Sequence, residues 1–235
     1  MEIDKIFDSF SGRSLFKNKN VLRINYVPEA ISHRDKQIEN VASILAPALK
    51  GERVSNLFVF GNTGSGKTLV VDYVSDELVK RVQANGEDVL KIVNVNCKLK
   101  KVADTEYRIL AEIIRQFGGS VPVTGLPTDS VYNKFIEIID GKKQLVLIVL
   151  DEIDQAVKKI SDGFLYTLTR LNSELRNAQI SLVGISNSLT FMDGLDPRVR
   201  SSLGEEELVF PPYNALQLQD ILKERALQAF NEGAL

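Results

Sequence analysis

The sequence predicts an α/β fold in which a mainly parallel sheet of five strands lies between helices. Two observations predict it. Short apolar runs rich in Val, Ile and Phe alternate along the chain with segments whose apolar residues recur three and four positions apart. The apolar runs also lack the polar alternation of a half-exposed sheet, which is typical of strands buried on both faces. Buried strands that alternate with amphipathic helices indicate a parallel sheet covered by helices on both sides.

Five apolar runs are predicted to form the strands, the last with the weakest signal: residues 57–60, 90–95, 145–150, 180–185 and 208–210. The helical periodicity predicts helices over residues 69–82, 107–117 and 164–175. A further helix follows Asp129, and the side chains expected on its inner face are Val131, Tyr132, Phe135, Ile136 and Ile139.

The two ends of the chain lie outside this alternation. The first 50 residues are predicted as loop and helix, with a helix-like stretch over residues 32–49. Near the other end, Asn214 and Gln217 are typical of a capping box that opens a helix. The apolar side chains expected on one side of that helix are Leu218, Ile221, Leu222 and Phe230. We therefore expect one α/β domain over residues 1–213 and the beginning of a second, small domain over residues 214–235.

Composition and charge exclude several classes of protein. The hydrophobic fraction of 44% and the charged fraction of 26% are those of a globular chain rather than a disordered one. The chain has 29 basic and 31 acidic side chains, so its net charge is close to zero. Any contact with nucleic acid must therefore come from a local basic patch. Cys97 is the single cysteine, no apolar run is long enough to span a bilayer, and the first residues lack the layout of a secretory signal. We expect a cytoplasmic, intracellular protein with no membrane partner.

A complete phosphate-loop motif, G-x-x-x-x-G-K-T, lies between the first predicted strand and the following helix. Its glycines allow main-chain N–H groups to converge on phosphate oxygens, and the helix start adds a partial positive charge of about half a unit. Lys67 would bridge the β- and γ-phosphates, and the Thr68 hydroxyl would bind Mg²⁺. The residues expected to bind the nucleotide here are Gly61, Asn62, Thr63, Gly64, Ser65, Gly66, Lys67, Thr68 and Leu69.

Two carboxylates directly follow the strand predicted over residues 145–150. Ligands bind at the carboxyl ends of strands in open α/β sheets, so Asp151 is predicted to organise Mg²⁺ and Glu152 to activate the attacking water. Asp154 is interpreted as a helix cap or a surface charge. The next predicted strand ends before Asn187, which either contacts the γ-phosphate and its water or is an ordinary turn residue.

The remaining motifs exclude other phosphate-loop families. The base-reading Asn-Lys-x-Asp motif of GTPases is absent, because Asn133-Lys134 continues with Phe135-Ile136. The Leu-Ser-Gly-Gly-Gln signature of transporter ATPases is absent as well, and the length cannot supply the second sheet of a two-lobed helicase. An ATP-driven switch with ATP or ADP and Mg²⁺ as cofactors remains.

From residue 16 onward the chain resembles the archaeal replication initiators, AAA+ ATPases similar to the origin recognition complex and its cell-division-cycle partner. The segments that carry the resemblance are Pro28 with His33-Arg34-Asp35-Lys36-Gln37, the phosphate loop, Leu150-Asp151-Glu152-Ile153-Asp154, Ile185-Ser186-Asn187, Asp196-Pro197-Arg198-Val199-Arg200-Ser201 and Phe210-Pro211-Pro212-Tyr213. The resemblance implies an AAA+ fold, with residues 214–235 as the start of a helical lid whose remainder and winged-helix domain lie outside this sequence.

The resemblance also implies roles for further residues. Adenine would be bound by Val27, Pro28, His33 and Arg34, although His33 alone is equally typical of a polar residue at a helix start. Asn187 would sense the γ-phosphate, and Arg198 or Arg200 would act as an arginine finger at a neighbouring subunit's nucleotide. Residues 118–128 lie where these initiators contact DNA.

The function that these expectations favour is a replication initiator that binds double-stranded origin DNA and helps load the replicative helicase with other initiator subunits, with ATP as the switch. Two alternatives stay open. A clamp-loader-like or signalling AAA+ ATPase would share every phosphate motif, and a nucleotide-binding adaptor would act through protein contacts with negligible turnover.

Overall fold

The computed structural model describes residues 15–23, 26–28, 30–98, 103–122 and 125–231. The chain divides into two compact units, one formed by residues 36–212 and the other by the segments before residue 36 and after residue 212. In the described part of the chain, no helix combines the length and the apolar character needed to cross a membrane.

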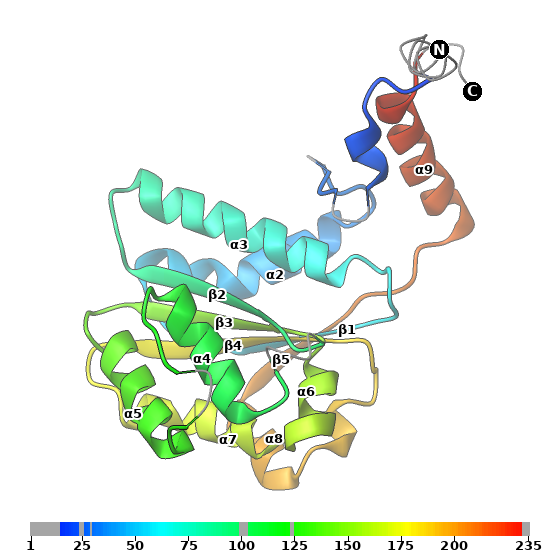
Figure 1. Ribbon diagram of the computed structural model, residues 1–235. Coiled ribbons are helices and arrows are strands. Elements are labelled where there is room, and N and C mark those ends of the chain that lie inside the picture. Colours follow the sequence, from blue (N-terminus) through cyan, green and yellow to red (C-terminus); the bar gives the residue numbers. More distant parts are fainter. Residues whose placement is uncertain (1–14, 24–25, 29, 99–102, 123–124, 232–235) are drawn as a thin grey trace, which may run out of the picture. The chain divides into compact units, whose positions relative to one another are not determined.

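The larger unit is built on one five-stranded sheet (Figure 1). Its strands are β1 Asn56–Phe60, β2 Leu90–Asn96, β3 Leu145–Asp151, β4 Gln179–Ser186 and β5 Glu205–Val209. The order across the sheet is β2-β3-β4-β1-β5, and every neighbouring pair is parallel. The predicted α/β class is confirmed, and the sheet is parallel throughout rather than mainly so.

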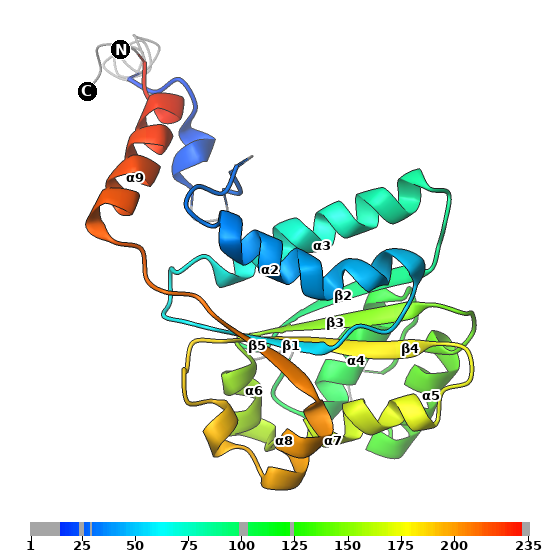
Figure 2. The same ribbon diagram turned by 180° about the vertical axis from the view of Figure 1, so that it is seen from behind.

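Helices cover both faces of the sheet. In the two opposite views, α2 Asp35–Leu45 and α3 Lys67–Ala84 lie on one face (Figures 1 and 2). The helices on the other face are α4 Glu106–Gln116, α5 Thr128–Ile139, α6 Ile153–Ile160, α7 Gly163–Arg170 and α8 Pro197–Leu203. Short 3-10 turns span Ala46–Lys50, Leu171–Ser173 and Met192–Gly194.

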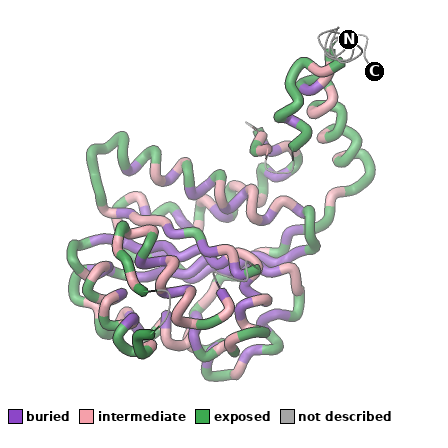
Figure 3. The backbone as a smooth tube through the Cα atoms, viewed as in Figure 1, coloured by how far each residue is buried: buried purple, intermediate pink, exposed green. Residues whose placement is uncertain are grey.

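The core lies along the central strands, where the buried residues concentrate (Figure 3). In β3 the six side chains from Leu145 to Leu150 are at most 2% exposed, which explains why this strand reads as one continuous apolar run. Gly184 in β4 allows close packing, because a Cβ there would lie 2.5 Å from the ring of Phe58. Burying one large apolar side chain fully contributes about 1.5–3 kcal/mol to the free energy of unfolding, so the buried side chains of the central strands stabilise the unit.

The structure differs from the predicted helices in two places. The short helices α6 and α8 are absent from the prediction, since each offers only about two turns of periodic signal between a strand and a loop. The helix predicted over residues 164–175 ends at Arg170 and continues as a 3-10 turn. Both differences lie in short segments that connect strands of the sheet.

The smaller unit joins the described N-terminal residues to α9 Ala215–Ala229. The predicted capping box is present: Gln217 N–H donates to Asn214 Oδ1 at 2.9 Å, and Asn214 N–H donates to Gln217 Oε1 at 3.0 Å. A 3-10 turn spans Lys19–Leu22. Before it, the Phe16 ring packs against the ring of Phe230, which follows α9. After it, the Tyr26 hydroxyl donates a hydrogen bond to the Gln228 side chain of α9. The predicted domain boundary between residues 213 and 214 stays a prediction.

Candidate functional site

The phosphate loop connects β1 to α3, as its motif predicts. Gly66 caps α3 with a φ of 86°, a left-handed conformation that glycine adopts most readily. At Gly61 a Cβ would lie 2.4 Å from the carbonyl oxygen of Phe210, so only glycine fits between the two chain segments. Of the other loop residues, Asn62, Thr63 and Gly64 are exposed and Ser65 is buried, and Leu69 is half-buried in the first turn of α3. The backbone conformation of the loop therefore requires glycine at positions 61 and 66.

Lys67 joins this loop to the end of β4. The residue is 5% exposed, and its ammonium group donates to the carbonyl oxygens of Gly61 at 2.7 Å and Asn62 at 3.0 Å. A third hydrogen bond, 2.9 Å long, goes to Asn187 Oδ1. Burial lowers the pKa of Lys67, and the carboxylates of Asp151, Asp154 and Glu152 oppose that shift. The predicted phosphate-binding lysine and the predicted γ-phosphate sensor thus touch each other.

The two residues predicted to hold Mg²⁺ also meet. The Thr68 hydroxyl donates to Asp151 Oδ1 at 3.2 Å, with Asp151 at the last position of β3. Burial raises the pKa of Asp151, and the hydrogen bond from Thr68 opposes that shift. A hydroxyl and a carboxylate side by side form the kind of oxygen donor set that Mg²⁺ prefers, so these residues fit the predicted metal.

Glu152 occupies a strained position next to Asp151. Its φ of 54° and ψ of 45° are left-handed, which is uncommon for a residue other than glycine and clusters at functional sites. One carboxylate oxygen, Oε1, lies 3.4 Å from the Lys98 ammonium nitrogen. The other, Oε2, is buried and has no hydrogen-bond partner within the described residues. The predicted base is therefore held by its backbone and by one exposed lysine.

Asp154 corrects the sequence interpretation. The sequence favours a helix cap or a surface charge, but Asp154 is only 6% exposed and lies in the first turn of α6. Its Oδ1 accepts hydrogen bonds from the Ser186 hydroxyl at 3.2 Å and the Asn187 N–H at 3.4 Å. The carboxylate therefore connects the segment after Glu152 to the end of β4. Sequence reasoning misses this role because its partners are 32 and 33 residues away along the chain.

Asn96 is a further residue that sequence reasoning missed. It lies opposite Asp151 in the register of β2 and β3, and its side-chain amide donates to Asp151 Oδ2 at 3.4 Å. Its Oδ1 accepts the N–H of Lys98 at 3.1 Å. The available signal was a polar residue at the carboxyl end of a buried strand, the same signal that identified Asp151.

Comparisons with known proteins identify the family of the chain. A family model described as an AAA domain matches residues 52–192, which include the phosphate loop, Asp151 and Asn187. The chain belongs to this family.

Similar proteins narrow the family assignment of this AAA chain. An ORC1-type DNA replication protein of Thermococcus onnurineus is 51% identical over 238 residues, covering 99% of this chain and 56% of that protein. The solved structure of the Aeropyrum pernix ORC1 protein in complex with DNA has a TM-score of 0.84 and 43% identity, covering 94% of this chain and 56% of that one. The A. pernix ORC2 protein, solved as ADPNP-ADP complexes, has a TM-score of 0.76 and 26% identity over 93% of this chain and 58% of that one. The resemblance to archaeal ORC1-type replication proteins is confirmed, and the chain spans about half the length of the curated relatives it matches.

The two candidate arginine fingers of this AAA chain differ in their surroundings. Both are on α8, where the Arg198 side chain is 85% exposed and the Arg200 side chain 47% exposed. Asp196 holds the Arg198 guanidinium through two contacts of 3.1 Å. Arg200 instead lies 3.4 Å from Asp193 and 3.8 Å from Glu207. Arg198 is therefore the more exposed of the two and is held by a single carboxylate.

The four residues expected at adenine belong to the smaller unit of the AAA chain. Val27 is 67% exposed and Pro28 half-buried. His33 has a φ of 61° and pairs with Asp220 at 3.4 Å, whereas the buried Arg34 stacks 3.8 Å above the centre of the Tyr213 ring. Adenine binding by these residues remains a prediction of the resemblance.

The segment expected at DNA, residues 118–128, follows α4 and ends at Thr128, the first residue of α5. Residues 123 and 124 lie outside the described part. The Lys134 ammonium donates to the Ser120 carbonyl at 2.6 Å, and the Tyr107 hydroxyl donates to the Pro122 carbonyl. These contacts hold the first part of the segment to the neighbouring helices, and its contact with DNA remains a prediction.

Proposed function

We propose that this AAA chain is the ATP-binding part of a DNA replication initiator, in which bound ATP maintains the DNA-loading state and hydrolysis resets it. The observation that carries the proposal is the meeting of Lys67 with Asn187, and of Thr68 with Asp151, at the carboxyl ends of β1, β3 and β4. ORC1-type relatives of the chain are named as DNA replication proteins, and one was solved with DNA. The A. pernix ORC2 protein was solved with ADPNP and ADP, which supports ATP or ADP as the ligand of this chain.

In the proposed mechanism, the phosphate loop binds and orients the triphosphate. The N–H groups at the start of α3 and the Lys67 ammonium would contact its oxygens. Thr68 and Asp151 would hold Mg²⁺, which supplies positive charge to the phosphates when bound. Asn187 hydrogen bonds to the Lys67 ammonium, so its side chain would respond to the γ-phosphate that Lys67 contacts.

Glu152 is the proposed general base. It would accept a proton from the attacking water at a carboxylate oxygen, and Oε2 has no hydrogen-bond partner among the described residues that would compete for that proton. Arg198 is the proposed arginine finger for the nucleotide of a second subunit, because its guanidinium is exposed and rests on one carboxylate. Arg200 is the alternative finger.

Double-stranded origin DNA is the proposed target, and the replicative helicase and other initiator subunits are the proposed partners. The A. pernix ORC1 protein was solved in complex with DNA, which supports the first part of this proposal, and the resemblance supports the second. The proposal places the chain inside the cell, at chromosomal DNA. DNA contacts of this kind are mostly to phosphates, so binding should weaken steeply with added salt.

Two variants of the phosphate site test the proposal. Lys67→Ala should lose on the order of a hundredfold in ATP affinity, because it removes a buried charge that contacts the phosphates. Glu152→Gln should bind ATP normally and lose nearly all turnover, since an amide cannot accept the proton. Lys80→Ala is the control, because Lys80 is an exposed lysine of α3 that pairs with Glu77. Binding is measured with a fluorescent ATP analogue and turnover by phosphate release.

The outcomes separate the proposal from its alternatives. Unchanged ATP affinity in Lys67→Ala would contradict the site itself. Tight ATP binding without any phosphate release from the parent chain would favour the nucleotide-binding adaptor. Turnover that depends on Glu152 but no binding of a double-stranded oligonucleotide, with or without ATP, would favour the clamp-loader-like or signalling ATPase.

A further inference from the structure

The outer edge of β2 is bound by a glutamine side chain. Because β2 is at one end of the strand order, one of its sides pairs with β3 and the other faces away from the sheet. On that outer side, the Gln116 amide donates to the Asn94 carbonyl at 2.7 Å, and Gln116 Oε1 accepts the Asn94 N–H at 3.2 Å. One side chain thus binds both main-chain groups of a strand residue, as the opposite residue of a neighbouring antiparallel strand would do.

The hydrogen bonds at the two ends of β2 show which of its main-chain groups face outward. The Val89 carbonyl accepts an N–H from β3 at 2.7 Å, and the Cys97 N–H donates to a carbonyl at the end of β3 at 2.8 Å. The odd-numbered residues of this stretch therefore face β3. Main-chain groups alternate in direction along a strand, so the even-numbered residues of β2 face outward. Asn94, the residue that Gln116 binds, is one of them.

Gln116 is held in this position by its own helix. It is the last residue of α4, and its amide also donates to Glu112 Oε1, one turn earlier, at 2.8 Å. Glu112 in turn accepts a hydrogen bond from the Arg115 guanidinium at 2.9 Å. That hydrogen bond lowers the pKa of Glu112, so its carboxylate is ionised near neutral pH and accepts from the amide. The amide of Gln116 is therefore oriented toward β2 before any partner arrives.

The sequence of β2 is typical of strands that pair with other chains. The run Leu90-Lys91-Ile92-Val93-Asn94-Val95-Asn96 has one charged side chain, no proline and no glycine. Segments of about seven residues with high β propensity and little charge pair edge to edge when they are exposed. The other edge strand, β5, differs, because three of its five residues are glutamates, Glu205–Glu207. Charge repels a second copy from β5, and β2 carries no comparable charge.

We propose that Gln116 closes the edge of β2 against a second copy of this chain, and that loss of its amide allows two β2 edges to pair. The partner is a second copy because the edge is self-complementary. Two identical strands related by a twofold axis pair in antiparallel fashion, so that each outward N–H meets an outward carbonyl. The inference concerns association between chains and does not depend on the proposed function.

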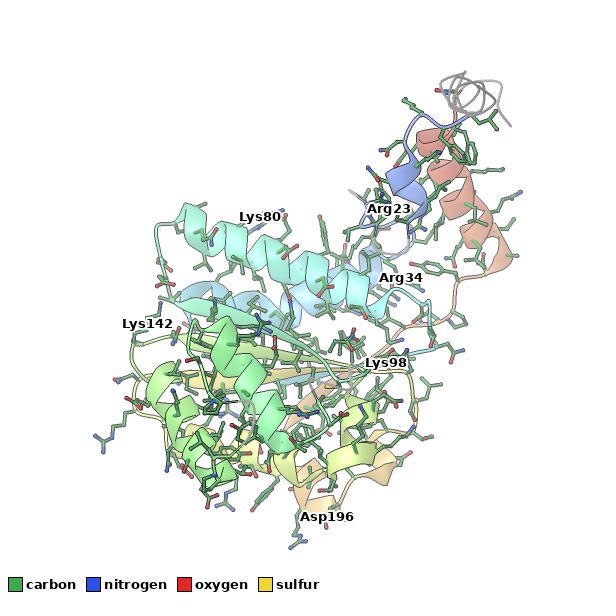
Figure 4. The ribbon with its side chains drawn as sticks, in the orientation of Figure 1. Arg23, Arg34, Lys80, Lys98, Lys142 and Asp196 are labelled. Carbon is green, nitrogen blue, oxygen red and sulfur yellow. The ribbon has the colours of Figure 1, made fainter. Side chains whose placement is uncertain are left out.

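Two glutamine variants test the inference by sedimentation velocity of the whole chain over a range of concentrations. Gln116→Met keeps the length of the side chain and removes the amide, so it should form a dimer or a larger species that grows with concentration. Gln83→Met is the matched control, because Gln83 is an exposed glutamine in the last turn of α3. It comes three residues after Lys80, which Figure 4 shows on α3, on the face of the sheet opposite α4. The control should sediment as the parent does.

A second substitution tests whether the new contact uses β2. Adding Asn94→Lys to Gln116→Met puts a charge on the open edge, and lysine on an edge strand disfavours pairing. The double variant should therefore sediment as the parent does. At low concentration, hydrogen exchange of the Asn94 N–H should be about two- to tenfold faster in Gln116→Met than in the parent, the change expected for the loss of one hydrogen bond.

Three results would each overturn the inference. If Gln116→Met sediments as the parent does at every concentration, the edge needs no cover. If Gln116→Met associates and Asn94→Lys does not reverse the association, the contact lies elsewhere or follows from partial unfolding. If the Asn94 N–H exchanges at the parent rate in Gln116→Met, the amide does not protect the strand.

Discussion

Asp154 accepts the main-chain N–H of Asn187 at 3.4 Å, and this contact ties the helix after β3 to the end of β4. The same carboxylate oxygen accepts the Ser186 hydroxyl at 3.2 Å. Asn187 in turn accepts a hydrogen bond from the Lys67 ammonium. The buried Asp154 carboxylate thus sets the position of a residue that contacts the phosphate-binding lysine.

Replacing Asp154 should therefore affect stability and turnover together. Asp154→Ala should lower the free energy of unfolding by about 2–3 kcal/mol, because it leaves the Ser186 and Asn187 donors without their charged acceptor. Turnover should fall because Asn187 is no longer held near Lys67. Urea unfolding and phosphate release measure the two effects. Asp154→Asn keeps an acceptor oxygen and should lose less stability and less turnover than Asp154→Ala. Equal urea midpoints for the parent and Asp154→Ala would refute the structural role of Asp154.

The contrast between Asp151 and Asp154 shows what can be predicted from sequence. Asp151 is predictable because it ends a strand of six apolar residues, and a parallel sheet places such an end at the ligand edge. Asp154 is not, because its partners come from another strand and depend on the order of β3 and β4 in the sheet. No local pattern encodes that order.

The same limit applies to the loops around the site. The contact between Lys98 and Glu152 depends on β2 and β3 being neighbours, with Asn96 opposite Asp151. The glycines of the phosphate loop are predictable because their spacing and the flanking elements follow from local backbone needs. Local chemistry is therefore readable from sequence, and side-chain contacts between elements are not.

Cys97 should be almost unreactive in the folded chain. Its side chain is 0% exposed, and burial, together with the nearby Asp151 carboxylate, raises the pKa of the thiol to about 12. Because the thiolate is the reactive form, labelling at about pH 8 with a disulfide reagent should be slower by about a hundredfold or more than in the urea-unfolded chain. The single cysteine makes the signal unambiguous. Labelling of the folded chain at the unfolded rate would show that this end of β2 opens freely.

Asp140 should stabilise the turn that precedes β4. Its carboxylate accepts the N–H groups of Arg176 at 3.0 Å, Asn177 at 2.7 Å and Ala178 at 2.8 Å. These hydrogen bonds, the one from Ala178 first, hold the pKa of Asp140 below its usual value of 3.8. A depressed pKa means that the stabilisation is present above pH 3.8 and is lost as the pH falls through the lower, folded-state value.

Asp140→Ala should accordingly lower the free energy of unfolding near neutral pH by about 2 kcal/mol, since three N–H donors lose their acceptor. Asp140→Asn retains one acceptor oxygen, so its free energy of unfolding should lie between those of the parent and Asp140→Ala. Urea unfolding at neutral pH measures the difference. If Asp140→Ala unfolds at the parent's urea midpoint, the three hydrogen bonds contribute nothing net and the assignment is wrong.

Asp72 carries the opposite pH signature. It lies one turn after Thr68 in α3, and burial, followed by the negative charges of Asp151 and Asp76, raises the pKa of its carboxyl from 3.8 to about 6. In the folded state the group therefore holds its proton more strongly than in the unfolded chain. The sign follows from linkage: stability falls as the pH rises from 3.8 to about 6, and the full cost is present above pH 6.

Asp72→Asn removes this cost. At about pH 7 the variant should be more stable than the parent by about 1–2 kcal/mol, a value reduced from the full shift because the half-buried group is partly screened by solvent. The difference should shrink as the pH falls toward about 4, where the Asp72 carboxyl becomes protonated in both states. Asp76→Asn, an exposed carboxylate on the same helix, is the control and should change stability by about 0.5 kcal/mol or less. Urea unfolding of the three proteins between about pH 4 and 8 measures these curves; a constant offset between Asp72→Asn and the parent across that range would show that Asp72 ionises normally in the folded chain.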